Sequence, residues 1–209
     1  MALDLTAPPI VEPVSLAEMK LHLRVDDDLT EDDALIQLLI TAARRHAEMV
    51  CNASFVTQSW RLTLDAFPGG AGLAGYTSGA GAIIFERGPV QSVDSIRYTD
   101  LSGTNQLITS PGMPDYAVDL AGRIARMSPA FGKVWPIPMP QIGAVRINYT
   151  AGYGDTADAV PEGVRHWIMV RAGTCYRNRE EVALVTRGGK LQALPFMDGL
   201  LDPYRTISV

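Results

Sequence analysis

The sequence contains only two cysteines and three histidines among 209 residues. Cys51 and Cys175 lie far apart and lack the close pairing of a metal or redox motif. We interpret them as two buried free thiols of a protein made in a reducing cytoplasm. No His-x-x-x-His or His-Glu-x-x-His spacing places two ligands on one helical face. The sequence therefore predicts no metal site at its isolated histidines, His22, His46 and His166.

Long apolar runs and an excess of positive charge are also missing. No run approaches the ~20 apolar residues of a membrane helix, and the N-terminus shows no signal peptide, so no membrane partner is predicted. The net charge of −5 argues against a protein whose main task is to grip a phosphate backbone. A mildly acidic surface still lets DNA slide past. The hydrophobic content of 47% is that of an ordinary globular protein with a real core.

Motifs for nucleotides, hard cations and catalysis are absent. The Gly-Gly-Lys run at 188–190 lacks the upstream glycine of a phosphate loop, and no Ser or Thr follows the lysine. The Gly-Tyr-Gly run at 152–154 lacks the third glycine of a dinucleotide motif and is interpreted as a turn. The acidic runs 26–28 and 31–33 have no EF-hand spacing. No nucleophile elbow appears. We expect no cofactor and no enzymatic activity.

Helix signals are present at both ends of the chain. Residues 1–14 contain three prolines and are expected to form an extended N-terminal arm. Ser15 and Glu18 form a capping-box pattern at the start of a helix over 15–25. Thr30 is expected to cap a second, amphipathic helix that ends near Cys51. Its apolar stripe is predicted at Leu35, Ile36, Leu39, Ile40, Ala42, Ala43, His46 and Val50, with Arg44, Arg45 and Glu48 on the other side.

From residue 55 the apolar period changes from 3.6 to 2, which predicts strands. About six short strands are expected, from the stretches 60–64, 83–86, 93–99, 106–109, 116–120, 123–127 and 144–150. The glycine-rich stretch 69–81 is expected to be a loop, and 134–141 a proline-rich crossing. Pro161 suits the first turn of a third helix, which should end near Arg179. Its predicted apolar stripe is Val164, Trp167, Ile168, Ala172 and Cys175.

These elements predict an α+β fold that is mainly helical. It has two N-terminal helices, one long C-terminal helix, a central antiparallel β insertion and extended termini. The expected parts are the arm 1–14, the helices 15–54, the β insertion 55–155, a helix and loop over 156–192 that pack on the first helices, and a C-terminal docking tail, 193–209.

The arginines of the third helix and its exit have two interpretations. They can form an ordinary solvated face, or they can pair with acidic residues of a neighbouring subunit, because guanidinium suits interfaces. The acidic stretch 26–33 is then the natural partner. DNA binding is the least favoured reading. The candidate interface residues are Arg165, Arg171, Arg177 and Arg179, with Asp27, Asp28 and Asp32 as their partners.

An ordered series of stretches resembles one protein family. The series has seven runs, which begin at Glu12 (Glu-Pro-Val-Ser-Leu-Ala-Glu-Met), Glu31 (Glu-Asp-Asp-Ala-Leu-Ile), Thr57 (Thr-Gln-Ser-Trp-Arg-Leu), Arg87 (Arg-Gly-Pro-Val-Gln-Ser-Val), Tyr149 (Tyr-Thr-Ala-Gly-Tyr-Gly), Val160 (Val-Pro-Glu-Gly-Val-Arg) and Tyr176 (Tyr-Arg-Asn-Arg-Glu). A Leu-Pro-Phe run follows near the C-terminus. The series resembles the head–tail connector (adaptor) family of long-tailed phages, prophages and gene transfer agents. No single motif is chemically diagnostic; the resemblance runs from about residue 8 to residue 205.

The resemblance implies a structural ring protein. It implies a dodecamer of identical subunits that lies below the portal in the neck of the particle, extends the DNA channel and joins the capsid vertex to the tail. Its partners would be itself, the portal protein, a stopper or tail-side neck protein, and DNA that passes through the lumen without specific binding. The C-terminal segment, apolar without an obvious regular partner, is expected to dock on the portal through Leu194, Phe196, Leu200, Leu201, Tyr204 and Ile207.

Other functions stay open at this point. A DNA-binding accessory protein would need a concentrated basic patch. A stopper or tail terminator is another possible neck component, although the long flanking helices count against its β-barrel body. An enzyme that uses the β insertion as its site would reveal itself by a bound ligand. The sequence does not distinguish an infectious phage from a prophage or a gene transfer agent.

Overall fold

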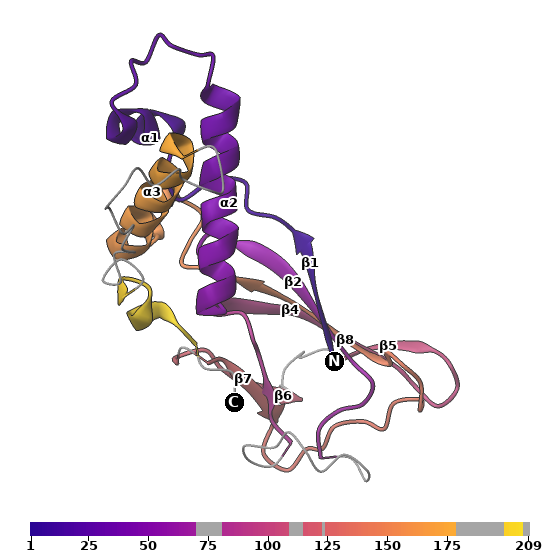
Figure 1. Cartoon of the computed structure of the whole chain (residues 1–209). Coiled ribbons are helices and arrows are strands. Elements are labelled where there is room, and N and C mark those ends of the chain that lie inside the picture. Colours follow the sequence, from indigo (N-terminus) through magenta and orange to yellow (C-terminus); the bar gives the residue numbers. More distant parts are fainter. Residues whose placement is uncertain (70–80, 109–114, 123, 179–198, 207–209) are drawn as a thin grey trace, which may run out of the picture. The chain divides into compact units, whose positions relative to one another are not determined.

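The computed structural model describes residues 1–69, 81–108, 115–122, 124–178 and 199–206 (Figure 1). Its helices are α1 (Leu16–Leu23), α2 (Asp33–Cys51) and α3 (Glu162–Arg177), with short 3-10 turns at Ala157–Ala159 and Asp202–Tyr204. Its strands are β1 (Ala2–Ala7), β2 (Gln58–Leu64), β3 (Ile83–Ile84), β4 (Val90–Thr99), β5 (Asn105–Ile108), β6 (Tyr116–Asp119), β7 (Arg126–Pro129) and β8 (Val145–Ala151).

The fold is α+β, as the sequence predicted, but it is not mainly helical. Helix and strand contribute about equally to the described residues, because the middle of the chain and its first residues together supply two antiparallel sheets. Most of the expected glycine-rich loop, the loop after α3 and the start of the docking tail fall on residues 70–80 and 179–198, outside the described residues.

The chain divides into two compact units, each with its own core. A helical unit comprises Ile10–Val56 and the described residues from Gly154 onward. A β unit comprises Met1–Pro9 and Thr57–Tyr153. The first part of the expected arm is therefore extended, but it is a strand of the β unit: β1 pairs antiparallel with β2, and Leu3 lies opposite Leu62.

The β unit is built on a five-stranded antiparallel sheet with the order β1-β2-β8-β4-β5. Side chains alternate between its two faces, as the pleat requires. In β8, Val145, Ile147 and Tyr149 are buried, whereas Arg146 and Asn148 point to the opposite face. The apolar face packs against a smaller sheet of order β3-β7-β6, which contributes Ile83 and Met127 to the same core.

The core of the helical unit lies between α2 and α3. Helix α2 contributes Ile36, Ile40, Ala43, Ala47 and Cys51, and α3 contributes Val164, Trp167, Ile168 and Ala172. The predicted stripe of the third helix is thus confirmed for four of its five residues. Cys175 is exposed in the last turn, so the expectation of two buried thiols is correct for Cys51 and wrong for Cys175.

The start and the faces of α2 differ from the prediction. The helix begins at Asp33 and its N-cap is Asp32, so Thr30 does not cap it. Its buried side is rotated from the predicted stripe: Ala42 and His46 are exposed, whereas Arg44 and Glu48, which we placed on the solvated side, are buried. The reason is a network of ion pairs, described below.

Candidate functional site

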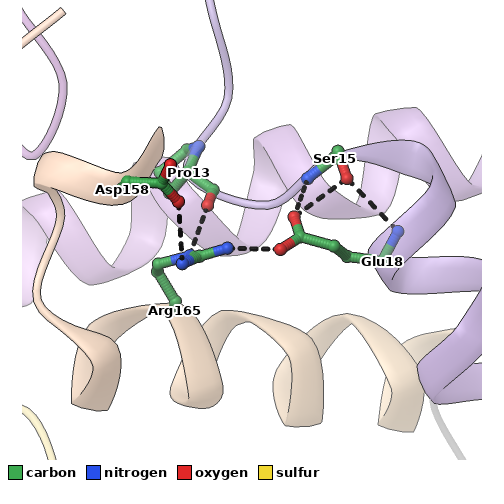
Figure 2. Close-up of polar contacts among 5 residues, drawn as sticks. All are labelled: Pro13, Ser15, Glu18, Asp158 and Arg165. Atoms are coloured by element: carbon green, nitrogen blue, oxygen red, sulfur yellow. Dashed lines mark hydrogen bonds and ion pairs between the residues drawn. The ribbon is translucent and has the colours of Figure 1, made fainter. Parts of the chain in front are cut away.

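Arg165 on α3 holds the chain that leads into α1 (Figure 2). Its Nε donates to the carbonyl oxygen of Pro13 at 3.0 Å, and one terminal nitrogen pairs with Oε1 of Glu18. The other terminal nitrogen lies 3.5 Å from Oδ1 of Asp158. One guanidinium therefore joins three segments of the helical unit, and the fork geometry of arginine suits such a junction.

The second carboxylate oxygen of Glu18 completes the capping box of α1. Glu18 Oε2 accepts from the backbone nitrogen of Ser15 at 2.9 Å, and Ser15 Oγ accepts from the backbone nitrogen of Glu18 at 3.2 Å. The capping box that the sequence predicted is confirmed. The hydrogen bond from the Ser15 backbone lowers the pKa of Glu18, and the positive charge of Arg165 adds to this effect.

The expected interface charges fall into two groups. Arg165 and Asp32 have partners within the chain, since the Tyr176 hydroxyl donates to Asp32 Oδ2 at 2.5 Å. Arg171, Arg177, Asp27 and Asp28 are exposed on the helical unit. Arg179 lies outside the described residues.

Lys20 shapes the acidic turn that follows α1. Its buried Nζ pairs with Asp33 at 2.6 Å and donates to the carbonyl oxygens of Asp27 and Leu29. The side chains of Asp27 and Asp28 are then left at the surface, because the turn is held through its backbone. This turn presents negative charge outward on a fixed scaffold.

Arg44 lies in a buried ion-pair network that the sequence did not predict. Arg44 Nε pairs with Glu12 at 2.7 Å, and Arg44 Nη1 pairs with Glu48 at 2.7 Å. Thr41 Oγ1 also donates to Glu12, and Glu48 accepts from the backbone nitrogen of Phe55 at 3.1 Å. Burial acts to lower the pKa of Arg44, but the hydrogen bond to Glu12 and the two negative charges outweigh it and raise the pKa.

A signal for this network exists in the sequence. Arg44 and Glu48 are four residues apart, the spacing of an ion pair on one helical face. Such pairs are commonly solvated, so the spacing alone does not predict burial. Burial depends on Glu12, which lies far away in sequence, at 2.7 Å from Arg44 in the structure.

The described part of the C-terminal segment packs on its own helical unit. Leu201 is buried in the core between α2 and α3, and Leu200 and Tyr204 pack against it. The backbone nitrogen of Thr206 donates to the carbonyl oxygen of Cys51 at 2.8 Å. The premise that this segment has no regular partner is therefore wrong for Leu200, Leu201 and Tyr204. Leu194, Phe196 and Ile207 lie outside the described residues.

Cys51 is enclosed by the same packing. Its Sγ lies 3.9 Å from the carbonyl oxygen of Leu201. Burial raises the pKa of the Cys51 thiol to about 11, so the group stays protonated at neutral pH. A protonated, enclosed thiol fits a structural role.

The β unit exposes an apolar, proline-rich segment at residues 131–142. Phe131 and Ile142 are almost fully exposed, and Val134 and Ile137 are largely so. The segment borders a groove of about 660 Å³, whose wall includes Trp135 and the neighbouring prolines. The Trp135 ring stacks on Phe67 with ring centres 4.9 Å apart. Apolar surface of this extent is typical of a protein–protein contact.

The described residues offer neither a candidate metal site nor a candidate membrane span. They hold no group of three or more His, Cys, Asp or Glu side chains that could bind a metal ion. None of their helices has the length and hydropathy to cross a bilayer. What this part of the chain does offer is surface: an outward acidic turn, exposed arginines on α3, and the apolar segment of the β unit.

Solved structures share this fold over the whole chain. A chain from the virion of a native gene transfer agent particle has a TM-score of 0.76 and 22% identity. A chain from the neck of an empty particle of this kind, computed with C6 symmetry, has a TM-score of 0.76 and 24% identity. A chain from the neck of a native particle, computed with C12 symmetry, has a TM-score of 0.66 and 20% identity. Each likeness covers 100% of this chain and 97% of the other.

The fold is thus one that occurs in the neck of gene transfer agent particles. Residues 13–101 match the model of the phage gp6-like head–tail connector protein family. This match confirms the resemblance to the head–tail connector family, and it includes α1, α2 and strands β2 and β4 of the large sheet. No curated protein sequence matches the chain.

Proposed function

We propose that the chain is a structural, non-catalytic head–tail connector in the neck of a tailed-phage-like particle. Copies form a ring below the portal, extend the DNA channel and join the capsid vertex to the tail. The family match over residues 13–101 carries this proposal. The fold shared with neck chains supports it, and the C12 symmetry of one of those necks favours a dodecamer.

A ring requires heterologous contacts, in which one face of a subunit meets a different face of the next. The exposed Arg171 and Arg177 and the acidic turn with Asp27 and Asp28 are oppositely charged surfaces of one unit. In the proposal they meet between neighbouring subunits and select the register of the ring. Arg165 supports this interface from within, since it fixes α1 against α3.

The portal contact is proposed for the C-terminal segment. Leu200, Leu201 and Tyr204 anchor this segment on the core of the helical unit. Leu194 and Phe196 then carry the contact with the portal, together with Ile207. A stopper or tail-side neck protein is the proposed partner on the other side of the ring, and the exposed segment 131–142 is an apolar surface suited to protein contact.

The function is tested by native mass spectrometry and electron microscopy of the protein, alone and mixed with the portal from the same gene cluster. We expect a ring, or a stack on the portal. The variant R171E/R177E should lose the ring, and adding D27K/D28K should restore it, because the charges are exchanged. The variant L194S/F196S should keep the ring and lose the portal.

Other outcomes contradict the proposal. A wild-type protein that stays monomeric with the portal overturns the connector function. In that case strong DNA binding would favour an accessory protein of the packaged genome, and binding to a tail component alone would favour a stopper or tail terminator.

A further inference from the structure

The solvent-facing side of the five-stranded sheet carries three exposed arginines. Arg61 lies on β2, Arg97 on β4 and Arg146 on β8, and each alternates with residues of the buried core. We call this surface the arginine face. Its other members are small polar side chains on the same three strands, Ser59, Thr63, Ser95, Asn148 and Thr150.

Two of these arginines are direct neighbours across strands. Arg97 lies opposite Arg146 in the register of β4 and β8. Like charges in this position destabilise a sheet. No ion pair within the described residues offsets them. The two guanidinium groups therefore repel each other across the strands, and a bound anion would reduce this repulsion.

The third arginine is oriented by neutral partners. Arg61 Nε donates to Asn148 Oδ1 at 3.1 Å, and Asn148 Nδ2 donates to Ser95 Oγ at 2.9 Å. This row crosses three strands and sets the guanidinium on the surface without neutralising it. Asp4 lies opposite Arg61 on the edge strand β1 but makes no ion pair with it among the described contacts.

Two other charged side chains of the β unit, Asp94 and Arg126, already have partners within the chain. Asp94 accepts from the hydroxyls of Ser92 at 2.7 Å and Thr150 at 2.9 Å. Away from the arginine face, Arg126 pairs with Asp119 at 3.1 Å. The positive charge on the arginine face is thus available to a ligand, while the carboxylate beside it is occupied by hydroxyl groups.

The chemistry of this face favours phosphate over a protein surface. Protein interfaces have apolar, aromatic-rich centres, and on the arginine face the large apolar side chain is Leu107, at the β5 edge. Arginine, serine, threonine and asparagine are the usual donors to DNA phosphates. The face presents no aromatic ring on which unpaired bases could stack, which favours a duplex.

We infer that the arginine face contacts the phosphate backbone of double-stranded DNA without reading its sequence. The inference deepens the proposed function and rests on it, since the channel of a connector is where this chain would meet a duplex. Three arginines neutralise about three phosphates, so log K should fall with log salt at a slope of about −2.7. One subunit would bind weakly, and a ring would add its copies by multivalency.

The test uses the full-length protein and a fluorescent 30-base-pair duplex in anisotropy titrations from 50 to 200 mM salt. For a single wild-type subunit, affinity should fall about 40-fold over this range, and for a ring of several subunits it should fall more steeply. For R97Q/R146Q, the fall should be about fourfold, with weaker binding at low salt. The control R126Q removes an exposed arginine of the β unit that is already paired, and it should behave like the wild type. Two unrelated duplex sequences should give the same result.

Three results would overturn the inference. They are no DNA binding by the wild type at low salt, DNA binding by R97Q/R146Q that equals the wild type, or a loss of DNA affinity in R126Q as large as that in R97Q/R146Q. Native mass spectrometry of the same proteins distinguishes a failure of the DNA inference from a failure of the proposed connector function. If R97Q/R146Q loses the ring and keeps DNA binding, the arginine face is a protein interface. If the wild type forms no ring yet shows the predicted salt slope, the connector proposal fails and the DNA contact stands.

Discussion

At the scale of single residues, Arg44 is a buried charge on which the stability of the helical unit depends. It is 4% exposed and is held between two carboxylates, Glu12 and Glu48. Loss of one member of such a network leaves the other charges buried without their partner, which costs more than the intact network contributes. Arg45, the next residue in the helix, is exposed.

The first prediction compares these two neighbours. R44A should lower the free energy of unfolding by roughly 3–5 kcal/mol, because Glu12 and Glu48 are left without their counter-ion. R45A removes the same side chain from the same helix and should change the free energy by less than about 0.5 kcal/mol. Urea unfolding followed by circular dichroism measures both. Equal losses would show that the network does not hold the helical unit together.

At the scale of elements, the start of α1 depends on one carboxylate with two roles. Glu18 caps the helix through Ser15 and ties it to α3 through Arg165. Its pKa is lowered in the folded protein, first by the Ser15 backbone. A group of this kind stabilises the fold above its ordinary pKa of 4.5, and the contribution is lost as pH falls through the lower folded value.

The second prediction follows from this pH dependence of the Glu18 contribution. The melting temperature of E18Q should lie below that of the wild type at pH 6 to 7, and the difference should shrink as the pH is lowered below 4.5. Differential scanning calorimetry at several pH values measures it. E162Q, which alters an exposed glutamate at the start of α3, serves as control. A difference that is constant with pH would mean that the charge of Glu18 is unimportant.

At the scale of the whole molecule, two separate cores suggest two separately responding units. Leu201 closes the core of the helical unit, whereas Ile147 lies in the core of the β unit. Removing a buried leucine side chain costs about 2–5 kcal/mol. That loss should be confined to the unit in which the cavity forms, since local stability follows local packing.

The third prediction tests this with hydrogen exchange. L201A should speed the exchange of amides in α2 and α3 and leave those of β2 and β8 unchanged. L38A provides a control, because Leu38 is exposed on α2 and its truncation should have little effect. Faster exchange in both units would show that they unfold together.

Much of the fold was predictable from sequence, because its signals are local. The capping box at Ser15 and the period-2 alternation of β4 and β8 each depend on residues a few positions apart. The features that were missed depend on distant partners. Arg44 is buried because Glu12 lies beside it, and β1 forms because β2 offers an edge.

The candidate surfaces show the same division. The sequence alone was enough to name the charged residues of α3 and of the acidic turn as candidates for an interface. It did not reveal that Arg165 binds the Pro13 carbonyl oxygen within its own chain. The arginine face was not predicted either. Its three arginines lie on three strands and become neighbours only through the strand order of the sheet.

The pairing of β1 with β2 has a consequence for the order of events during synthesis. Ala2 pairs with Thr63, so a strand at the beginning of the chain waits for a partner that is translated about sixty residues later. At ~5–20 residues per second, this delay is about 3–12 s. Both α1 and α2 leave the ribosome in that interval. The nascent chain therefore carries the unpaired β1 segment while its first helices form. A chaperone or a second nascent chain would bind at this segment.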